Sequence, residues 1–132
     1  MKKILIIILL LSSIITLGQE LTTIKISVPN ETDEVFIVGN QESFGNWQPD
    51  KIKMNRISDY EREISLNLTF PTEFKFTRGT WESEAIITKL TGNPNFVLSE
   101  KPSTKLFYKI QGWTDQIDKF STFSGFKISE IN

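Results

Sequence analysis

The stretch Tyr60-Glu61-Arg62-Glu63-Ile64-Ser65-Leu66-Asn67-Leu68-Thr69-Phe70 alternates apolar and polar side chains over most of its length. Successive side chains of a β-strand point to opposite faces, so this period of two is typical of a strand with one face in a hydrophobic core. We expect the inward face to carry Ile64, Leu66, Leu68 and Phe70, and the outward face to carry Glu63, Ser65, Asn67 and Thr69.

Shorter apolar runs lie on both sides of this stretch, at residues 24–28, 34–39, 73–78, 85–87 and 105–113. The run 34–39 is apolar on both faces, which is typical of a strand in the middle of a sheet. Many short strands separated by turn residues, with no helical period after the N-terminal segment, predict an all-β fold. We expect an antiparallel, immunoglobulin-like β-sandwich of about seven strands.

The N-terminal segment has the pattern of a secretory signal peptide. Met1-Lys2-Lys3 is basic, residues 4–11 are an unbroken apolar run, and small residues lie near Gly18. The alternative is an uncleaved membrane anchor, but a spanning helix needs about 20 apolar residues. We therefore expect a signal peptide at 1–18, a sandwich domain at 19–115, a tail or last strand at 116–132, and a secreted or periplasmic protein.

The composition excludes several classes of function. Removing Lys2 and Lys3 from 15 basic residues leaves 13 against 16 acidic ones, a net charge of −3, which disfavours nucleic acid and anionic membranes as partners. The chain has no cysteine and no histidine, so it has neither a disulfide framework nor a Ser-His-Asp site. No calcium-loop or phosphate-loop motif is present either. We expect no metal, no cofactor and no catalytic residue.

Two strand-and-turn stretches each present a tryptophan. The run 35–40 leads on to Trp47, and Phe74-Lys75-Phe76-Thr77-Arg78-Gly79-Thr80-Trp81-Glu82 turns at its glycine, which adopts turn conformations at little cost. The C–H face of a sugar ring packs on an aromatic ring, while its hydroxyls need fixed donors and acceptors. Trp47 and Trp81, with Lys75 facing outward between them, are typical of such a site.

These pieces resemble the starch-binding domains of carbohydrate-binding module family 20 and the related glycogen-binding domains of family 48. The resemblance lies in an apolar Val-Gly-Asn, a Gly-Asn-Trp-x-Pro, an aromatic-Lys-Phe strand and a Trp-Glu, in that order, and it covers residues 21–115. The form is most similar to a version that precedes the esterase-like hydrolase domain of secreted bacterial proteins. Trp113-Thr114-Asp115 and residues 121–125 resemble the junction to that domain; a last strand with a loose terminus is the alternative.

The resemblance implies one α-glucan site and assigns its residues. Lys75 matches a lysine that donates to sugar hydroxyls, and Asn95 lies where the family has a sugar-binding asparagine, although Phe96 replaces the arginine that usually follows. Residues 28–33 have no aromatic side chain to match the tyrosines of the family's second site. One site at most is therefore expected, for starch, glycogen or maltooligosaccharide.

Several of these residues also have a structural interpretation. Trp47 is nearly as well explained as a corner residue that caps the sandwich. Phe44 is expected in the core, and Trp113, at the end of a strand, is expected to have a structural role. Glu82 and Glu84 lie on one short segment and are expected to be solvated surface acids that face the same way, which does not suit the paired carboxylates of a glycosidase.

Two functions therefore remain open. One is a non-catalytic, monomeric module that binds α-glucan. The other is a secreted interaction or spacer domain, derived from a truncated esterase-type protein, that binds a protein partner such as a hydrolase. Exposure of both Trp47 and Trp81 on one concave surface would favour the sugar, and burial of Trp47 would favour the spacer.

Overall fold

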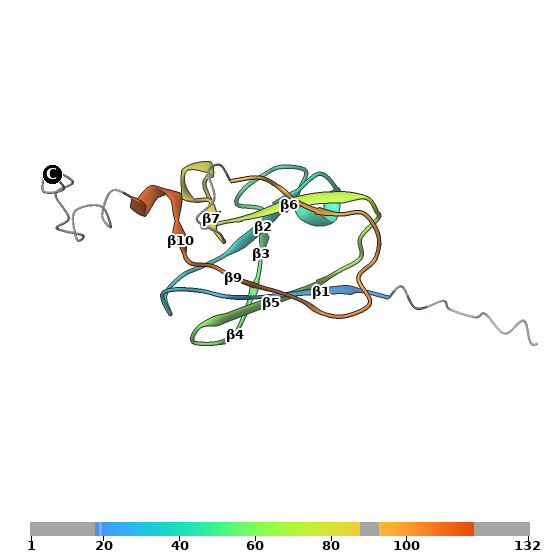
Figure 1. Cartoon of the computed structure of the whole chain (residues 1–132), viewed down its shortest axis with the longest axis horizontal. Helices are drawn as coiled ribbons and strands as arrows, with labels where there is room; N and C mark the ends of the chain where they lie inside the picture. The colour runs from blue at the N-terminus through green and yellow to red at the C-terminus, as the bar shows by residue number, and fades with distance from the viewer. Residues whose placement is uncertain (1–17, 19, 88–92, 118–132) are drawn as a thin grey trace, which may run out of the picture.

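The computed structural model describes residues 18, 20–87 and 93–117, and in these ranges the protein is a β-sandwich. Two four-stranded sheets form its layers (Figure 1). The first has the order β4 (Asn55–Ser58), β5 (Glu61–Leu66), β1 (Thr22–Ser27), β9 (Leu106–Lys109). The second has the order β3 (Ile52–Lys53), β2 (Phe36–Gly39), β6 (Thr72–Thr77), β8 (Phe96–Leu98). A two-stranded sheet pairs β7 (Ala85–Ile86) with β10 (Gly112–Trp113).

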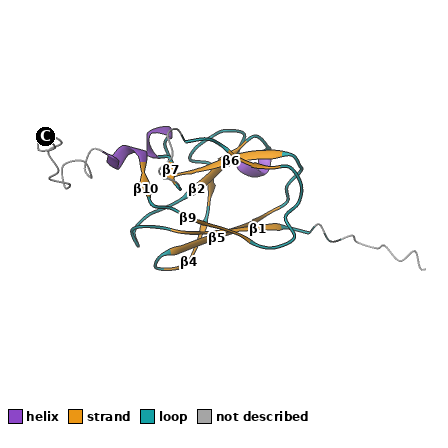
Figure 2. Ribbon diagram, viewed as in Figure 1, coloured by secondary structure: helices purple, strands orange, loops and turns teal. Residues whose placement is uncertain are grey.

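Three single turns of 3-10 helix lie among the described residues (Figure 2). These are η1 (Glu42–Phe44), η2 (Trp81–Ser83) and η3 (Thr114–Gln116). None of the described helices is long and apolar enough to cross a membrane. Residues 1–17 of the expected signal peptide and the segment 121–125 lie outside the described residues.

The expected all-β antiparallel sandwich is confirmed, and seven of the described strands have three or more residues. Strand β2 lies inside its sheet, as its apolar faces predicted. One pairing is parallel: β9 runs alongside β1 in the same direction, with Ile24 opposite Leu106. The sequence pattern did not predict this pairing.

Two expected strands end earlier than predicted. Strand β5 stops at Leu66 because its neighbour β1 begins at Thr22, the partner of Leu66, although Leu68 beyond it is still buried. The expected strand 105–113 is broken into β9 and β10. The amide of Ile110 donates to Ser27 of the first sheet, whereas the amide of Gln111 donates to Ile86, so the chain changes sheets between them.

Aromatic rings fill the space between the layers. The centroid of the Phe74 ring lies 5.2 Å from that of Phe44 and 5.4 Å from that of Phe96. The side chains of Phe76 and Trp113 are also buried. The predicted core position of Phe44 is thus confirmed, and the full burial of Trp113 agrees with the structural role expected for it. Core aromatic pairs of this kind add to the free energy that comes from burying their area.

Arg62 is buried at an inward position of β5, which its charge did not suggest. Its guanidinium donates to main-chain carbonyls, including those of Asp33 and Glu31, at 2.8–3.1 Å. These bonds replace water around the charge, so the burial of Arg62 does not leave its donors unsatisfied.

Candidate functional site

The loop after β2 holds Trp47 in a constrained backbone. Gly45, Asn46 and Trp47 all have positive φ, at 76°, 49° and 62°. Glycine and asparagine adopt this left-handed region readily, but a bulky tryptophan does so rarely. The amide of Trp47 donates to the carbonyl of Gly39 at 2.8 Å, at the end of β2, which fixes the position of the loop.

The second tryptophan lies on η2, directly after the turn that ends β6. Gly79 has φ of 105°, a conformation that side-chain-bearing residues rarely adopt, as its place in the sequence predicted. The turn closes where the amide of Arg78 donates to the carbonyl of Ser83 at 3.2 Å and to its hydroxyl at 3.1 Å. Trp81 therefore projects from a closed turn and is 42% exposed.

The two tryptophan loops meet at the end of β6. The hydroxyl of Thr77 donates to the carbonyl of Pro49 at 2.7 Å, which joins the first loop to the strand that leads to the second. The rings of Trp47 and Trp81 lie 6.4 Å apart between centroids and are inclined by 39°. Trp47 is half-buried, so the exposure criterion is only partly met. The structure brings together the two aromatic residues that the sequence singled out.

The ammonium of Lys75 is held in a polar cluster. It donates to the carboxylate of Glu84 at 2.7 Å and to the main-chain carbonyl of Asn93 at 2.6 Å. The side-chain amide of Asn93 donates to the same carboxylate oxygen at 2.6 Å. In the described part of the chain, the polar contacts of Lys75 thus go to these two residues.

Asn95 lies directly before β8, next to β6 of the same sheet. In the antiparallel pair of β6 and β8, Phe74 is opposite Phe96. Continuing this register by one residue places Asn95 opposite Lys75. The side-chain amide of Asn95 donates to Glu73 of β6 at 3.0 Å, and the residue is exposed. Its carbonyl oxygen is an acceptor of the kind that sugar hydroxyls need.

The interpretation of Glu84 as a solvated surface acid was wrong. Its side chain is only 19% exposed and forms the ion pair with Lys75, whereas Glu82 is exposed as expected. The two acids therefore do not face the same surroundings. Glu84 and Asn93 are the residues that sequence reasoning missed. The sequence does show an acidic residue, Glu84, next to an apolar strand, and an asparagine, Asn93, in a Gly-Asn-Pro-Asn stretch. Neither feature indicates that these two residues contact Lys75.

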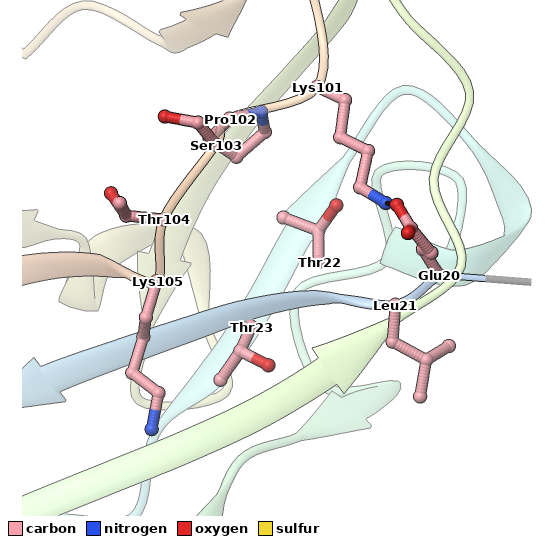
Figure 3. A pocket seen from close by; sticks show the side chains of 9 residues that line it. All are labelled: Glu20, Leu21, Thr22, Thr23, Lys101, Pro102, Ser103, Thr104 and Lys105. Carbon is pink, nitrogen blue, oxygen red and sulfur yellow. Dashed lines mark hydrogen bonds and ion pairs between the residues drawn. The ribbon is translucent and has the colours of Figure 1, made fainter.

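Two hollows in the described part of the surface do not include Trp47 or Trp81 in their lining. One, of about 580 Å³, lies between residues 20–23 and residues 101–105, where Lys101 reaches Glu20 (Figure 3). The other, of about 400 Å³, is lined by charged groups that include Asp33, Arg78 and Asp115. Neither has an aromatic side chain in its lining, so neither offers a stacking platform for a sugar.

The tryptophan pair and the polar cluster together suit a neutral, ring-shaped ligand. Two inclined aromatic faces can pack against apolar C–H faces, and the lysine and asparagine groups can bond to hydroxyls. In the described ranges no group of three or more acidic side chains is placed to hold a metal ion.

The chain matches the family model described as starch binding domain over residues 21–106. This range covers about two thirds of the 132 residues and includes both tryptophans, Lys75 and Asn95. The protein belongs to the starch-binding domain family. No curated protein sequence gives a significant match to the chain.

Proposed function

We propose that the protein is a non-catalytic module that binds α-glucan at the pair Trp47 and Trp81. The observation that supports this is the contact of the two rings, 6.4 Å apart at an angle of 39° on loops from different strands. Successive glucose units of an α-glucan turn relative to one another, so two inclined rings fit such a chain better than one flat wall. Lys75 and Asn95 would supply hydrogen bonds to the hydroxyls.

The direct test is retention of the chain from Gln19 onward on insoluble starch, with cellulose as the control polymer. We expect retention on starch and none on cellulose. Absence of retention on starch would contradict the proposal.

Trp81→Ala tests the site itself. Removing an aromatic anchor typically costs about 2 kcal/mol or more of binding free energy, which should abolish retention at a weak site. An exposed ring contributes little to the core, so the melting temperature should hardly change. Phe107→Ala is the matched control, because Phe107 is also exposed but lies on β9 of the other sheet.

We also propose that residues 1–18 direct export and are removed, leaving a secreted or periplasmic protein that begins at Gln19. The support is the Lys2-Lys3 start and the apolar run at 4–11. Mass spectrometry of the exported protein should find this N-terminus, and a protein that still begins at Met1 would contradict the proposal.

A second candidate function is a spacer or interaction domain of the esterase-associated type, which binds a protein partner such as a hydrolase. The half-buried position of Trp47 favours it, because a corner residue that caps the sandwich would be placed in this way. Starch retention that survives loss of Trp47 but not of Trp81 would assign Trp47 to the fold. No starch retention, with co-purification of a hydrolase, would support the second function over the first.

A further inference from the structure

We propose that Glu84 is a positioning and specificity-determining residue of this site. It aims the ammonium of Lys75 and cancels its charge, so that the site takes a neutral rather than an anionic polysaccharide. The proposal rests on the proposed glucan function.

The cluster is a closed triangle of short contacts. Lys75 contacts Glu84 and Asn93, and Asn93 contacts Glu84, at distances of 2.6–2.7 Å. The side chains of Lys75 and Glu84 are only 16% and 19% exposed. Partly buried ion pairs are screened by salt less than exposed ones, and charge-assisted hydrogen bonds are the stronger kind. The triangle therefore restricts the direction of the ammonium.

The main chain of Glu84 is fixed as firmly as its carboxylate. It forms a β-bridge with Thr77 and exchanges two hydrogen bonds with Thr114, at 3.0 Å each. The hydroxyl of Thr114 also donates to the carbonyl of Glu82 at 2.6 Å, next to Trp81. The residue that holds Lys75 thus belongs to the same rigid turn that presents Trp81.

The contacts within the triangle leave Lys75 able to donate one further hydrogen bond. An ammonium has three donors, and the contacts with Glu84 and Asn93 use two, so one proton can be given to a sugar hydroxyl. Because the carboxylate beside it carries the opposite charge, Lys75 and Glu84 together are neutral. A carboxylated or sulfated polymer therefore gains no net attraction at this point, whereas a neutral hydroxyl still meets a donor.

Glu84→Gln and Glu84→Ala separate geometry from charge. Both contacts of the carboxylate end on the same oxygen, Oε2, so the single carbonyl oxygen of glutamine can accept both. We expect Glu84→Gln to retain affinity for a soluble maltooligosaccharide within about threefold, and Glu84→Ala to lose about tenfold, the scale of a lost hydrogen bond to a charged group. Calorimetric titration measures both.

The effect of Glu84 on charge is tested with carboxymethylated starch, an anionic polymer. Glu84→Gln leaves Lys75 uncompensated, so retention on this polymer at low salt should rise above that of the parent. Glu61→Gln is the matched control, since Glu61 forms a 2.7 Å ion pair with Lys25 in the other sheet and its loss changes the net charge equally. It should leave neutral-glucan affinity unchanged and gain less on the anionic polymer.

The outcomes distinguish this proposal from the proposed function. If the parent binds no α-glucan, both fail. If the parent binds and a folded Glu84→Ala protein binds equally well, the role of Glu84 is wrong and the tryptophan site stands. If Glu84→Ala does not fold, Glu84→Gln decides: no gain on carboxymethylated starch beyond that of Glu61→Gln overturns the proposal.

Discussion

Trp113 and the pair Trp47–Trp81 are the same kind of side chain in opposite surroundings. Trp113 is fully buried, its indole N–H donates to Asp33 at 3.0 Å, and the guanidinium of Arg78 lies 5.3 Å from the centre of its ring. Trp81 stands on a turn with much of its ring exposed. A buried indole with its N–H satisfied contributes to the stability of the fold, whereas an exposed ring on a rigid turn contributes little to the core and is available to a ligand.

Arg78 connects these two regions. Its amide closes the turn that presents Trp81, while its side chain lies over Trp113 and pairs with Asp115 at 2.5 Å. The core tryptophan therefore also supports the backbone of the candidate site. Substitutions in the core and in the candidate site, each tested for both stability and starch binding, show whether the two regions affect one another.

Trp113→Ala should have the largest effect. It removes a fully buried aromatic side chain and leaves Asp33 without one donor, which should lower the free energy of unfolding by about 3–5 kcal/mol. Urea denaturation measures the loss. The control is Trp113→Phe, which preserves most of the volume and should lose less. Starch retention of the folded fraction should match the parent, and a specific loss of binding would show that the regions are coupled.

Trp47→Ala should lower stability less than Trp113→Ala but more than Trp81→Ala, because the ring of Trp47 is half-buried and lies against that of Trp81. We expect a loss of about 2 kcal/mol of glucan-binding free energy, as for an aromatic anchor, together with a lower melting temperature. Trp81→Ala is the comparison and should change binding alone. Equal melting temperatures for the two variants would remove the structural role that we assign to Trp47.

Asp33→Asn probes the polar support of the core tryptophan. The buried carboxylate of Asp33 accepts from Trp113 and from Asn30, and the change removes its charge while retaining its shape. The expected loss of stability is about 1 kcal/mol, the scale of one hydrogen bond. Glu34→Gln at the neighbouring exposed position should change stability by less, and a larger effect there would contradict this account.

Tyr108→Phe should have the smallest effect and extends the comparison to a third aromatic position. Burial raises the pKa of the Tyr108 hydroxyl above its ordinary value. The folded state therefore favours the neutral phenol, so the stability from this group is complete below the unfolded pKa of about 10 and is lost as the pH rises through the folded value. Thermal melts between neutral and alkaline pH should show a shallower alkaline decline for Tyr108→Phe, with little change at neutral pH. Identical alkaline slopes would contradict it.

The sequence by itself determined the all-β class, several of the strands and part of the core. The alternation around Ile64 and the apolar run of β2 predicted their strands, because period and burial are local properties of a strand. Phe44 was predicted in the core, Trp113 in a structural role, and Gly79 at a turn that most residues adopt only at a cost. The order of motifs around Trp47 and Trp81 indicated the family, and these two rings do lie together.

Only the tertiary structure decided which groups meet across the fold. The parallel pairing of β9 with β1 and the change of sheets after Ile110 depend on chain paths that no local period records. The partners of Lys75 were hidden for the same reason. Glu84 is nine residues from Lys75 in the sequence and Asn93 is eighteen. No local periodicity of a strand predicts that residues at these separations will be in contact. Charge and polarity can be read from a sequence, but an ion pair depends on the distance and solvent exclusion that folding creates.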